Sequence, residues 1–378
     1  MKDDKPSSAS MDPVLTAWIR SESFTLITHS HHAFPPGSDQ SMTPFGAVLR
    51  QLQAQGAKRI RTIEHPLTRE WGAFSFIREW HHGVLTKSTS VRRPNIGSLS
   101  TPFDLLARPS GQQDSVFLAF DPAAALQCLM SRQKNRSVCA LWSIDFSPRR
   151  FDHRFLEACY QWVDASVSRR VDVHAEVSDA ALAARRERHN LEPLESRIVC
   201  PVGVWDEYFC RPSAGRFESK RLVYLGSVDE RNGMSELAAA LPNLLREIPG
   251  LQIDVIGRGP CTAKLASAAN QSNAGSQVRL HGFIDDTEEV TRLLGNAALG
   301  VAPFRKDENS FTAHADPGKL KWMAAAGLPV ITTDVPPNWS DITDHAGGEV
   351  VRAPAASADL VSAVSKILKD RTTWLKRS

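Results

Sequence analysis

The chain has 378 residues, more than one hydrophobic core usually serves, so two domains are expected. Its hydrophobic fraction of 42% and charged fraction of 23% are ordinary for a globular protein, and no apolar run approaches the roughly 18 residues of a membrane-spanning helix. A formal net charge of +3 is too small for a nucleic-acid binder and permits only weak contact with an anionic membrane.

The N-terminal segment and the cysteines indicate where the chain works. Residues 1–20 lack the apolar core of a signal peptide, and their composition predicts a disordered tail. The six cysteines lie far apart without a CxxC pair, which is typical of reduced thiols in a cytoplasmic protein. We therefore expect a cytoplasmic location, and a peripheral contact with the inner face of a membrane stays open.

Strand-like and helix-like segments alternate through the first half of the chain. Apolar, β-branched runs predict strands at 24–28, 59–63, 115–120, 138–144, 171–177 and 198–202. Helices are expected at 44–55, 122–132, 153–169 and 178–189. Residues 71–109 contain paired histidines, prolines and serines, which predict irregular loops. The alternation indicates an N-terminal domain over 21–205, with a parallel sheet covered by helices.

The second half repeats this organisation after a segment without a clear period. Residues 206–219 are expected to form the linker, and 220–378 the C-terminal domain. Strands are predicted at 221–226, 252–257, 278–281, 298–303, 330–333 and 349–352, with helices at 233–247, 286–296 and 357–370. The predicted fold class is α/β, with two Rossmann-like, doubly wound parallel-sheet domains that face each other across a cleft.

The segment 316–334, DPGKLKWMAAAGLPVITTD, is the most informative in the chain. A polar turn containing Asp316 and Lys319 opens a short, alanine-rich helix, and a β-branched strand follows a Gly-Leu-Pro break. In an open parallel sheet, ligands bind beyond the carboxyl ends of the strands, where helices begin. Lys319 would add an ammonium to the positive end of the helix dipole. The segment therefore predicts a diphosphate site.

Three further turns are informative mainly in combination. LVYLGSVDERNG (222–233) runs from a strand into a loop where amides can approach a phosphate, although a plain turn is the better reading of this segment taken alone. IDVIGRGP (253–260) has two glycines but lacks the third glycine of a dinucleotide fingerprint, so a nicotinamide site is not expected. In the loop at 282–284, Phe283 either packs beneath a nucleobase or belongs to the core.

In their order and spacing, these segments resemble the C-terminal, donor-binding domain of GT-B glycosyltransferases over about residues 221–371. The resemblance implies that the glycine turns line the donor, and that the last helix start holds the diphosphate and the sugar. The donor-binding residues it implies are Gly226, Ser227, Arg231, Gly257, Arg258, Gly259, Phe283, Asp316, Lys319 and Trp322.

The chain departs from the large retaining branch of that family. Trp322 stands where the branch has a glutamate, and Ser227 and Asn232 stand where it has an arginine and a lysine. Lys319 is kept, as in the divergent group-1-like subset with a DPxKL turn, and the chain is similar to exopolysaccharide-pathway enzymes such as the xanthan glucuronosyltransferase. These departures leave both the sugar and the stereochemical outcome open.

The first half supplies a candidate base and candidate acceptor contacts. Asp145 follows an apolar strand, a position from which a carboxylate can deprotonate an acceptor hydroxyl. Asp145 could equally cap the next helix or pair with Arg149 or Arg150, and these arginines could contact a lipid-linked pyrophosphate. His29 and His31 follow the first strand and are read as polar acceptor-side residues. Adjacent histidines on an extended chain suit chelation poorly, so no metal site is predicted.

The resemblance implies a metal-independent glycosyltransferase with Asp145 and Lys319 as catalytic residues. It would need no cofactor and would move a sugar from a nucleoside-diphosphate sugar to a glycan or lipid-linked acceptor in cell-surface or exopolysaccharide biosynthesis. Two alternatives stay open: a non-catalytic nucleotide-sugar-binding protein, motivated by Ser227, Asn232 and Trp322, and a nucleotide-sugar epimerase of related architecture. No nucleic-acid partner is expected.

Overall fold

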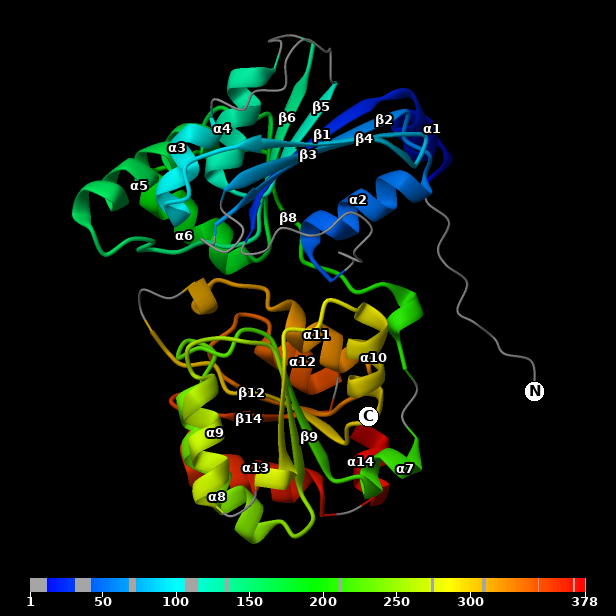
Figure 1. The fold of residues 1–378 in the computed structure, drawn as a ribbon, viewed down its shortest axis with the longest axis vertical. Coiled ribbons are helices and arrows are strands. Elements are labelled where there is room, and N and C mark those ends of the chain that lie inside the picture. Colours follow the sequence, from blue (N-terminus) through cyan, green and yellow to red (C-terminus); the bar gives the residue numbers. More distant parts are fainter. Residues whose placement is uncertain are drawn as a thin grey trace. The chain divides into compact units, whose positions relative to one another are not determined.

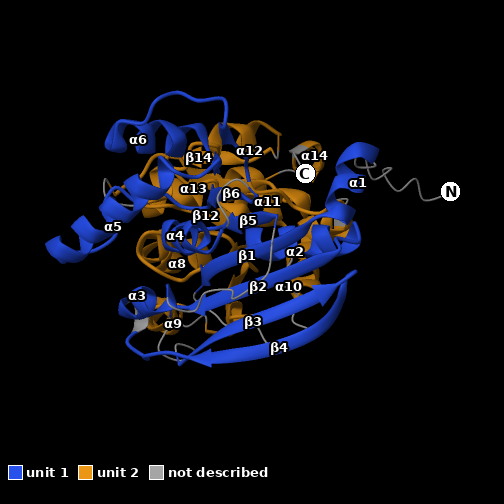
Figure 2. Cartoon of the chain, turned by 90° about the horizontal axis from the view of Figure 1, so that it is seen from above, with its two compact units in different colours: residues 1–201 blue, residues 202–378 orange. Residues whose placement is uncertain are grey.

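The computed structural model describes residues 12–30, 42–67, 73–105, 115–132, 136–210, 213–272, 275–307, 311–345, 347–369 and 371–377. The chain forms two compact units, unit 1 (Met1–Pro201) and unit 2 (Val202–Ser378) (Figures 1 and 2). Within the described ranges, every helix is too short or too polar to cross a membrane.

Unit 1 is built on an eight-stranded sheet in the order β4-β3-β2-β1-β5-β6-β7-β8. Strands β2, β1, β5, β6, β7 and β8 are neighbours in this order and run parallel. Strand β3 runs antiparallel to both of its neighbours, β2 and β4. Its strands are β1 (Ser23–Ser30), β2 (Arg59–Pro66), β3 (Phe74–His81), β4 (Val84–Arg92), β5 (Val116–Ala119), β6 (Val138–Ser143), β7 (Val173–Glu176) and β8 (Arg197–Val199). Its helices are α1 (Pro13–Ser21), α2 (Pro44–Ala54), α3 (Thr101–Asp104), α4 (Pro122–Ser131), α5 (Arg154–Ser168) and α6 (Asp179–His189), with a 3-10 turn η1 (Gly97–Ser100).

The parallel strands of unit 1 are buried on both faces. Successive side chains of a strand point to opposite faces, so β1 contributes to two cores. Leu26 packs in the cluster that contains Ile19 of α1 and Leu49 of α2. Ile27 packs in the other cluster, with Ala125 of α4 and Val167 of α5.

Part of the region expected to be irregular, 71–109, is instead a β-hairpin. β3 and β4 pair in antiparallel register and are joined at His82 and Gly83, which have φ of 47° and 79°. Two positive φ values in succession are typical of a tight two-residue hairpin turn. The prediction gave too little weight to the alternation of Phe74–His81 and too much to the paired histidines, of which His81 ends β3 and His82 begins the turn.

The predicted disordered tail, 1–20, is also partly ordered. α1 begins after Asp12, whose carboxylate accepts hydrogen bonds from the backbone N–H groups of Val14 and Leu15. A proline at the first helical position and an N-cap aspartate favour helix initiation. Ile19 is 5% exposed, so burial against the sheet stabilises this short helix. Residues 1–11 lie outside the described ranges.

Unit 2 is built on a six-stranded, all-parallel sheet in the order β11-β10-β9-β12-β13-β14. Its strands are β9 (Arg221–Leu225), β10 (Gln252–Ile256), β11 (Val278–Gly282), β12 (Leu299–Ala302), β13 (Val330–Thr333) and β14 (Glu349–Val351). Its helices are α7 (Ala214–Glu218), α8 (Met234–Glu247), α9 (Thr262–Gln271), α10 (Thr287–Gly295), α11 (Gly318–Ala325), α12 (Trp339–His345), α13 (Ser357–Ile367) and α14 (Arg371–Arg377). Its 3-10 turns are η2 (Asp206–Tyr208), η3 (Gly275–Gln277) and η4 (Phe311–Ala313).

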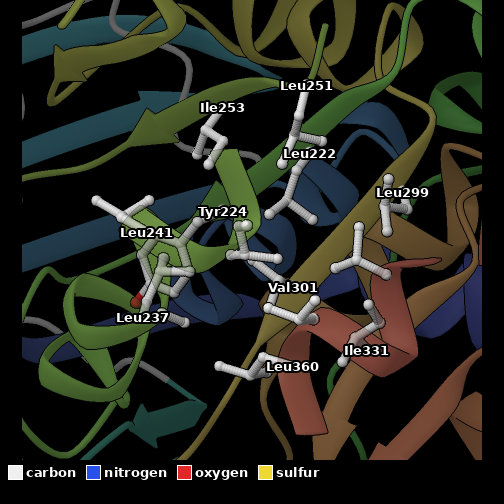
Figure 3. Close-up of a cluster of buried hydrophobic side chains, with 14 of the residues drawn as sticks. Leu222, Tyr224, Leu237, Leu241, Leu251, Ile253, Leu299, Val301, Ile331 and Leu360 are labelled. Carbon is white, nitrogen blue, oxygen red and sulfur yellow. The ribbon is translucent and has the colours of Figure 1, made fainter. Parts of the chain in front are cut away.

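One continuous core lies between the sheet of unit 2 and helices α8, α9 and α13. Leu222 and Tyr224 of β9 pack there with Leu237 of α8 and Leu360 of α13 (Figure 3). Helices α10, α11 and α12 lie on the opposite face of the sheet (Figure 1). The expected linker, 206–219, contains η2 and α7 and belongs to unit 2.

Candidate functional site

The strand order of unit 2 reverses between β9 and β12. Strands β10 and β11 lie on one side of β9, and β13 and β14 lie beyond β12. Such a reversal separates the loops at the carboxyl ends of the two central strands and leaves room for a ligand. The loops still meet at one point, because a Cβ on Gly233 would lie 1.7 Å from the carbonyl oxygen of Pro303.

Lys319 brings its ammonium to this reversal point. It lies in the first turn of α11, as the sequence predicted, and its Nζ donates to Tyr224 Oη (3.0 Å) and Asn232 Oδ1 (2.5 Å). Nζ also lies 4.9 Å from the ring centroid of Tyr224 and 5.1 Å from that of Phe304. Tyr224 comes from β9, and Phe304 follows β12. The two strands at the reversal therefore build a cage around one cation, which we call the lysine cage (Tyr224, Asn232, Phe304 and Lys319).

The lysine cage contains little negative charge. Burial lowers the pKa of the Lys319 ammonium from 10.5 to about 7, and the nearby charge of Asp229 offsets only part of this effect. Asp229 also accepts a hydrogen bond from Asn232 Nδ2 (2.8 Å), which fixes the amide oxygen toward Lys319. A cation held next to neutral oxygens and aromatic rings has much to gain from an incoming anion.

The glycines of the predicted donor turns are engaged with one another. The N–H of Gly226 donates to Ile256 O (2.9 Å), and the N–H of Gly257 donates to Gly282 O (2.7 Å). A Cβ on Gly257 would lie 1.8 Å from Gly226 O, and one on Gly259 would lie 2.3 Å from Val228 O. These glycines therefore let the loops after β9, β10 and β11 touch, and the Gly226 and Gly257 amides bind carbonyl oxygens.

Ser227, Arg231, Arg258 and Phe283 lie on the surface of these loops. Ser227 is exposed and accepts a hydrogen bond at its carbonyl from Tyr224 Oη (2.6 Å). The guanidinium of Arg231 lies 5.8 Å from the ring centroid of Phe311. Arg258 lies 5.5 Å from the Phe283 ring, which is 45% exposed. Of the two readings of Phe283, the structure therefore excludes the core.

Asp316 and Trp322 turn away from the lysine cage. Asp316 Oδ2 accepts from the N–H of Val202 (2.7 Å) and from Lys321 Nζ (2.5 Å), and its Oδ1 accepts from Asn338 (2.8 Å). Trp322 is 4% exposed, and its ring lies 4.8 Å from that of Tyr208. Both residues thus hold the beginning of unit 2 against α11.

Comparisons with known proteins assign this unit. Residues 219–370 match the family model described as "Glycosyl transferases group 1". Glycogen synthase of Mycobacterium tuberculosis is 29% identical over 170 residues, which cover 44% of this chain and 38% of the relative. Unit 2 is similar to a group 1 glycosyltransferase domain over most of its length, and we call it the group 1 domain. The chain matches well under half the length of that curated relative.

Solved structures extend the likeness of the fold to the whole chain. Sucrose-phosphate synthase of Thermosynechococcus elongatus superposes with a TM-score of 0.65 over 94% of both chains, at 17% identity. Anabaena HepE, solved with UDP and glucose, gives a TM-score of 0.62 over 94% of this chain and 93% of its own, at 12% identity. The predicted GT-B fold, with two Rossmann-like units, is thereby confirmed.

Outside the group 1 domain, Asp145 lies just after β6 and pairs with Arg150. Asp145 Oδ2 is 2.6 Å from Arg150 Nη1, and the two side chains are 29% and 31% exposed. The charge of Asp145 raises the pKa of Arg150. Arg149 is more exposed and donates to the carbonyl of Asp152 (3.2 Å). Asp145 is therefore a partly exposed carboxylate with a neighbouring cation.

A buried charge network that the sequence reasoning missed supports the Asp145 loop. Arg185 of α6 is fully buried and pairs with Asp164 of α5 and Glu176 of β7. It also donates to Ser143 Oγ (2.5 Å) and to the carbonyl of Asp145 (3.4 Å). Residues of α5, β7 and β6, and of the loop that follows β6, thus converge on one guanidinium. No signal in the sequence indicated that Arg185 is buried, because α6 is a largely polar helix.

His29 is brought to the corresponding strand reversal of unit 1, between β1 and β5. Its Nδ1 lies 3.0 Å from Asp121 Oδ1, and its Nε2 lies 3.5 Å from Asp104 Oδ2. Burial lowers the pKa of His29, but the two carboxylates outweigh this effect and raise it to about 9. Its side chain is only 5% exposed. His29 is thus a buried cation between two carboxylates, and His31 lies outside the described residues.

His65 stands next to His29 in the opposite protonation state. The two rings are 4.9 Å apart, and burial together with the charge of His29 lowers the pKa of His65 to about 4. His65 bonds to Ser75 Oγ (2.8 Å) and Gln127 Oε1 (3.0 Å). Within the parts of the chain that the structure describes, no group of three or more His, Cys, Asp or Glu side chains is arranged to hold a metal ion.

Proposed function

We propose that this chain is a glycosyltransferase that moves a sugar from a nucleoside-diphosphate sugar to a glycan or lipid-linked acceptor, in cell-surface or exopolysaccharide biosynthesis. The observation that carries the proposal is the lysine cage, at the strand reversal of a group 1 glycosyltransferase domain. HepE, of the same fold, was solved with UDP and glucose, which supports a nucleotide-sugar donor.

Lys319 would act on the leaving diphosphate. As the bond from the sugar to the diphosphate breaks, negative charge grows on the phosphate oxygens, and a positioned ammonium stabilises that charge. Asn232 and Tyr224 hold Lys319 Nζ in place before the donor arrives, so little reorganisation is needed. We propose that no metal or cofactor is required, because this ammonium and the start of α11 supply the positive charge.

Asp145 would act on the acceptor. Its carboxylate is partly exposed and lies 2.6 Å from Arg150 Nη1, and a carboxylate in this position can accept a proton from an acceptor hydroxyl. If the reaction inverts the anomeric configuration, Asp145 serves as the general base. If configuration is retained, Asp145 orients the hydroxyl.

Two variants separate the donor step from the chemical step. Lys319→Met keeps the aliphatic stem in the cage but removes the charge, and we expect it to weaken the binding of UDP, GDP or ADP roughly 10- to 100-fold. Asp145→Asn should bind the donor normally and lose turnover, by about 100-fold or more. The control is Lys366→Met. The Lys366 side chain is 60% exposed in the wild type and pairs with Glu349.

Calorimetry with the three nucleotides measures donor binding. Turnover assays with the matching sugar donors then measure the chemical step. Unchanged nucleotide affinity in Lys319→Met would contradict the donor site. Full turnover in Asp145→Asn would remove its role as base. A wild-type protein that binds a nucleotide sugar, yet neither transfers nor slowly hydrolyses it, would be the non-catalytic protein that Ser227 and Asn232 also suggest.

A further inference from the structure

Helix α5 carries an exposed apolar stripe. Phe155 is 68% exposed and Trp162 is 65% exposed, and Cys159 between them is also exposed. These positions are spaced by four and three residues, so they lie on one face of the helix. Figure 2 shows α5 extending outward from the body of unit 1. Two large aromatic side chains thus share a solvent-facing surface.

The opposite face of α5 is firmly held, so the orientation of the stripe is fixed. Asp164 is buried and pairs with Arg185 and with His189 (3.0 Å). Val167 is fully buried in the core beneath β1 and β5. Rotating the helix to hide Phe155 and Trp162 would break these buried ion pairs, which is strongly unfavourable. The exposure of the stripe is therefore built into the fold.

The surroundings of the stripe are basic. Arg154 precedes Phe155, Arg169 follows Trp162 by seven residues, and both are exposed, as are Arg149 and Arg170. Of the carboxylates on and before this helix, Asp164 is buried and Glu157 accepts from the backbone N–H groups of Arg150 and Phe151 (both 2.9 Å). Asp152 is exposed and lies 3.9 Å from Arg149, the partly exposed Asp145 pairs with Arg150, and Asp172, just after the helix, pairs with Arg132.

The exposed arginines around the stripe favour an anionic surface over a second copy of α5 as its partner. Two copies of α5 packed antiparallel would place Arg154 of one near Arg169 and Arg170 of the other, and like charges would repel. An anionic surface would instead meet arginines at both ends of the stripe. Tryptophan and phenylalanine flanked by arginine are typical of helices that lie in the interface of a bilayer.

We propose that α5 docks unit 1 on an anionic membrane surface, with Phe155 and Trp162 in the headgroup region and the surrounding arginines on lipid phosphates. This arrangement would suit the lipid-linked acceptor of the proposed function. It rests, however, on residues of unit 1 alone and does not require that the chain transfer a sugar.

Co-sedimentation of the full chain with vesicles, without nucleotide or acceptor, tests the docking. We expect binding to phosphatidylcholine vesicles that contain phosphatidylglycerol, weakened by salt, and little binding to phosphatidylcholine alone. Phe155→Ser with Trp162→Ser should lower the partition coefficient about tenfold or more, and Arg154→Gln with Arg170→Gln about tenfold. These side chains are exposed, so the variants should fold. The controls are Phe209→Ser, at a side chain that is 61% exposed in unit 2, and Arg246→Gln, which is 68% exposed there.

A polarity-sensitive dye on Cys159 locates the contact, once Cys200 and Cys210 are replaced by serine. Its emission should shift to shorter wavelength on anionic vesicles. Absence of vesicle binding, equal binding by the Phe155/Trp162 variant, or an unshifted dye would each overturn the proposal. So would a wild-type dimer that the same variant abolishes, since a second copy would then cover the face. Because no sugar donor is present, these outcomes are independent of the transferase test.

Discussion

Burial in the lysine cage lowers the pKa of the Lys319 ammonium toward neutral pH. Its pKa of about 7 lies below the ordinary lysine value of 10.5. Between these values the unfolded chain carries the proton and the folded chain does not. The contribution of Lys319 to the free energy of unfolding therefore rises as the pH increases from 7 toward 10.5. An anionic ligand has the opposite preference, because it stabilises the ammonium form.

We predict that the binding of a nucleoside-diphosphate sugar is coupled to proton uptake. Above pH 7, Lys319 must gain a proton when the diphosphate binds, so the affinity should fall by up to tenfold per pH unit. Calorimetry at pH 8 in buffers of different ionisation enthalpy should show uptake approaching one proton. Lys319→Met should abolish this uptake. A pH-independent affinity between 7 and 8.5 in the wild type would contradict the prediction.

At the scale of elements, Arg216 of α7 joins the ends of two helices. It is 6% exposed and donates to the carbonyls of Leu294 (3.2 Å) and Ala297 (3.1 Å), and to that of Ala326 (2.7 Å). Leu294 lies in the last turn of α10, and Ala326 caps α11. Helix C-termini leave carbonyls without intrahelical partners and favour a cation. Arg216 thus supports the helix that carries Lys319.

Arg216→Met should therefore destabilise the group 1 domain. Three carbonyls would lose a charged donor while the side-chain volume changes little, so we expect a loss of about 3 kcal/mol in the free energy of unfolding. Urea denaturation followed by circular dichroism measures the change. Arg246→Met, at an exposed position, should stay within about 0.5 kcal/mol. A loss under about 1 kcal/mol for Arg216→Met would show that water replaces the guanidinium.

The sequence predicted the elements whose pattern is local and failed where contacts are distant. The strand at 330–333 and the placement of Lys319 in the first turn of α11 followed from adjacent residues. The hairpin β3–β4 was missed because its turn is formed by a His-Gly pair rather than Asn-Gly or Asp-Gly.

The candidate site shows the same division. The pairing of Asp145 with Arg150, five residues apart, was one of the alternatives that the sequence offered. The His29–Asp121 pair joins positions separated by 92 residues, and no local pattern signals it. Trp322 was placed at the donor by analogy of position, yet its ring packs on Tyr208. A helical residue's direction depends on its neighbours in space, which spacing along the chain does not give.

At the scale of the whole molecule, the two units are separate in their cores. The hydrophobic cluster of unit 2 runs from Leu222 to Trp374, and α14 takes part through Trp374, whose indole N–H donates to Ala298 O (2.7 Å). Every contact of the Lys319 ammonium described above also comes from unit 2. Unit 2 thus has its own core and its own lysine cage.

We predict that Val202–Ser378 produced alone folds and binds a nucleoside diphosphate. Whichever of UDP, GDP and ADP binds the full chain should bind unit 2 with a dissociation constant within about threefold. Thermal unfolding with and without nucleotide shows whether the fragment folds, and calorimetry measures its dissociation constant. The same fragment with Lys319→Met is the control. A folded fragment that has lost affinity tenfold or more would show that unit 1 contributes directly to donor binding.

The close contact between the loops after β9 and β10 limits which residues can change in evolution. Gly257 and Gly259 face backbone oxygens so closely that any larger residue would push the loops apart, whether or not a donor ever binds. Lys319, whose charge is opposed by burial, is under no such backbone restriction. A lineage that lost the proposed sugar transfer would therefore keep its glycines and let position 319 change. The glycine pattern reports the shared fold, and Lys319 reports whether the proposed donor site is kept.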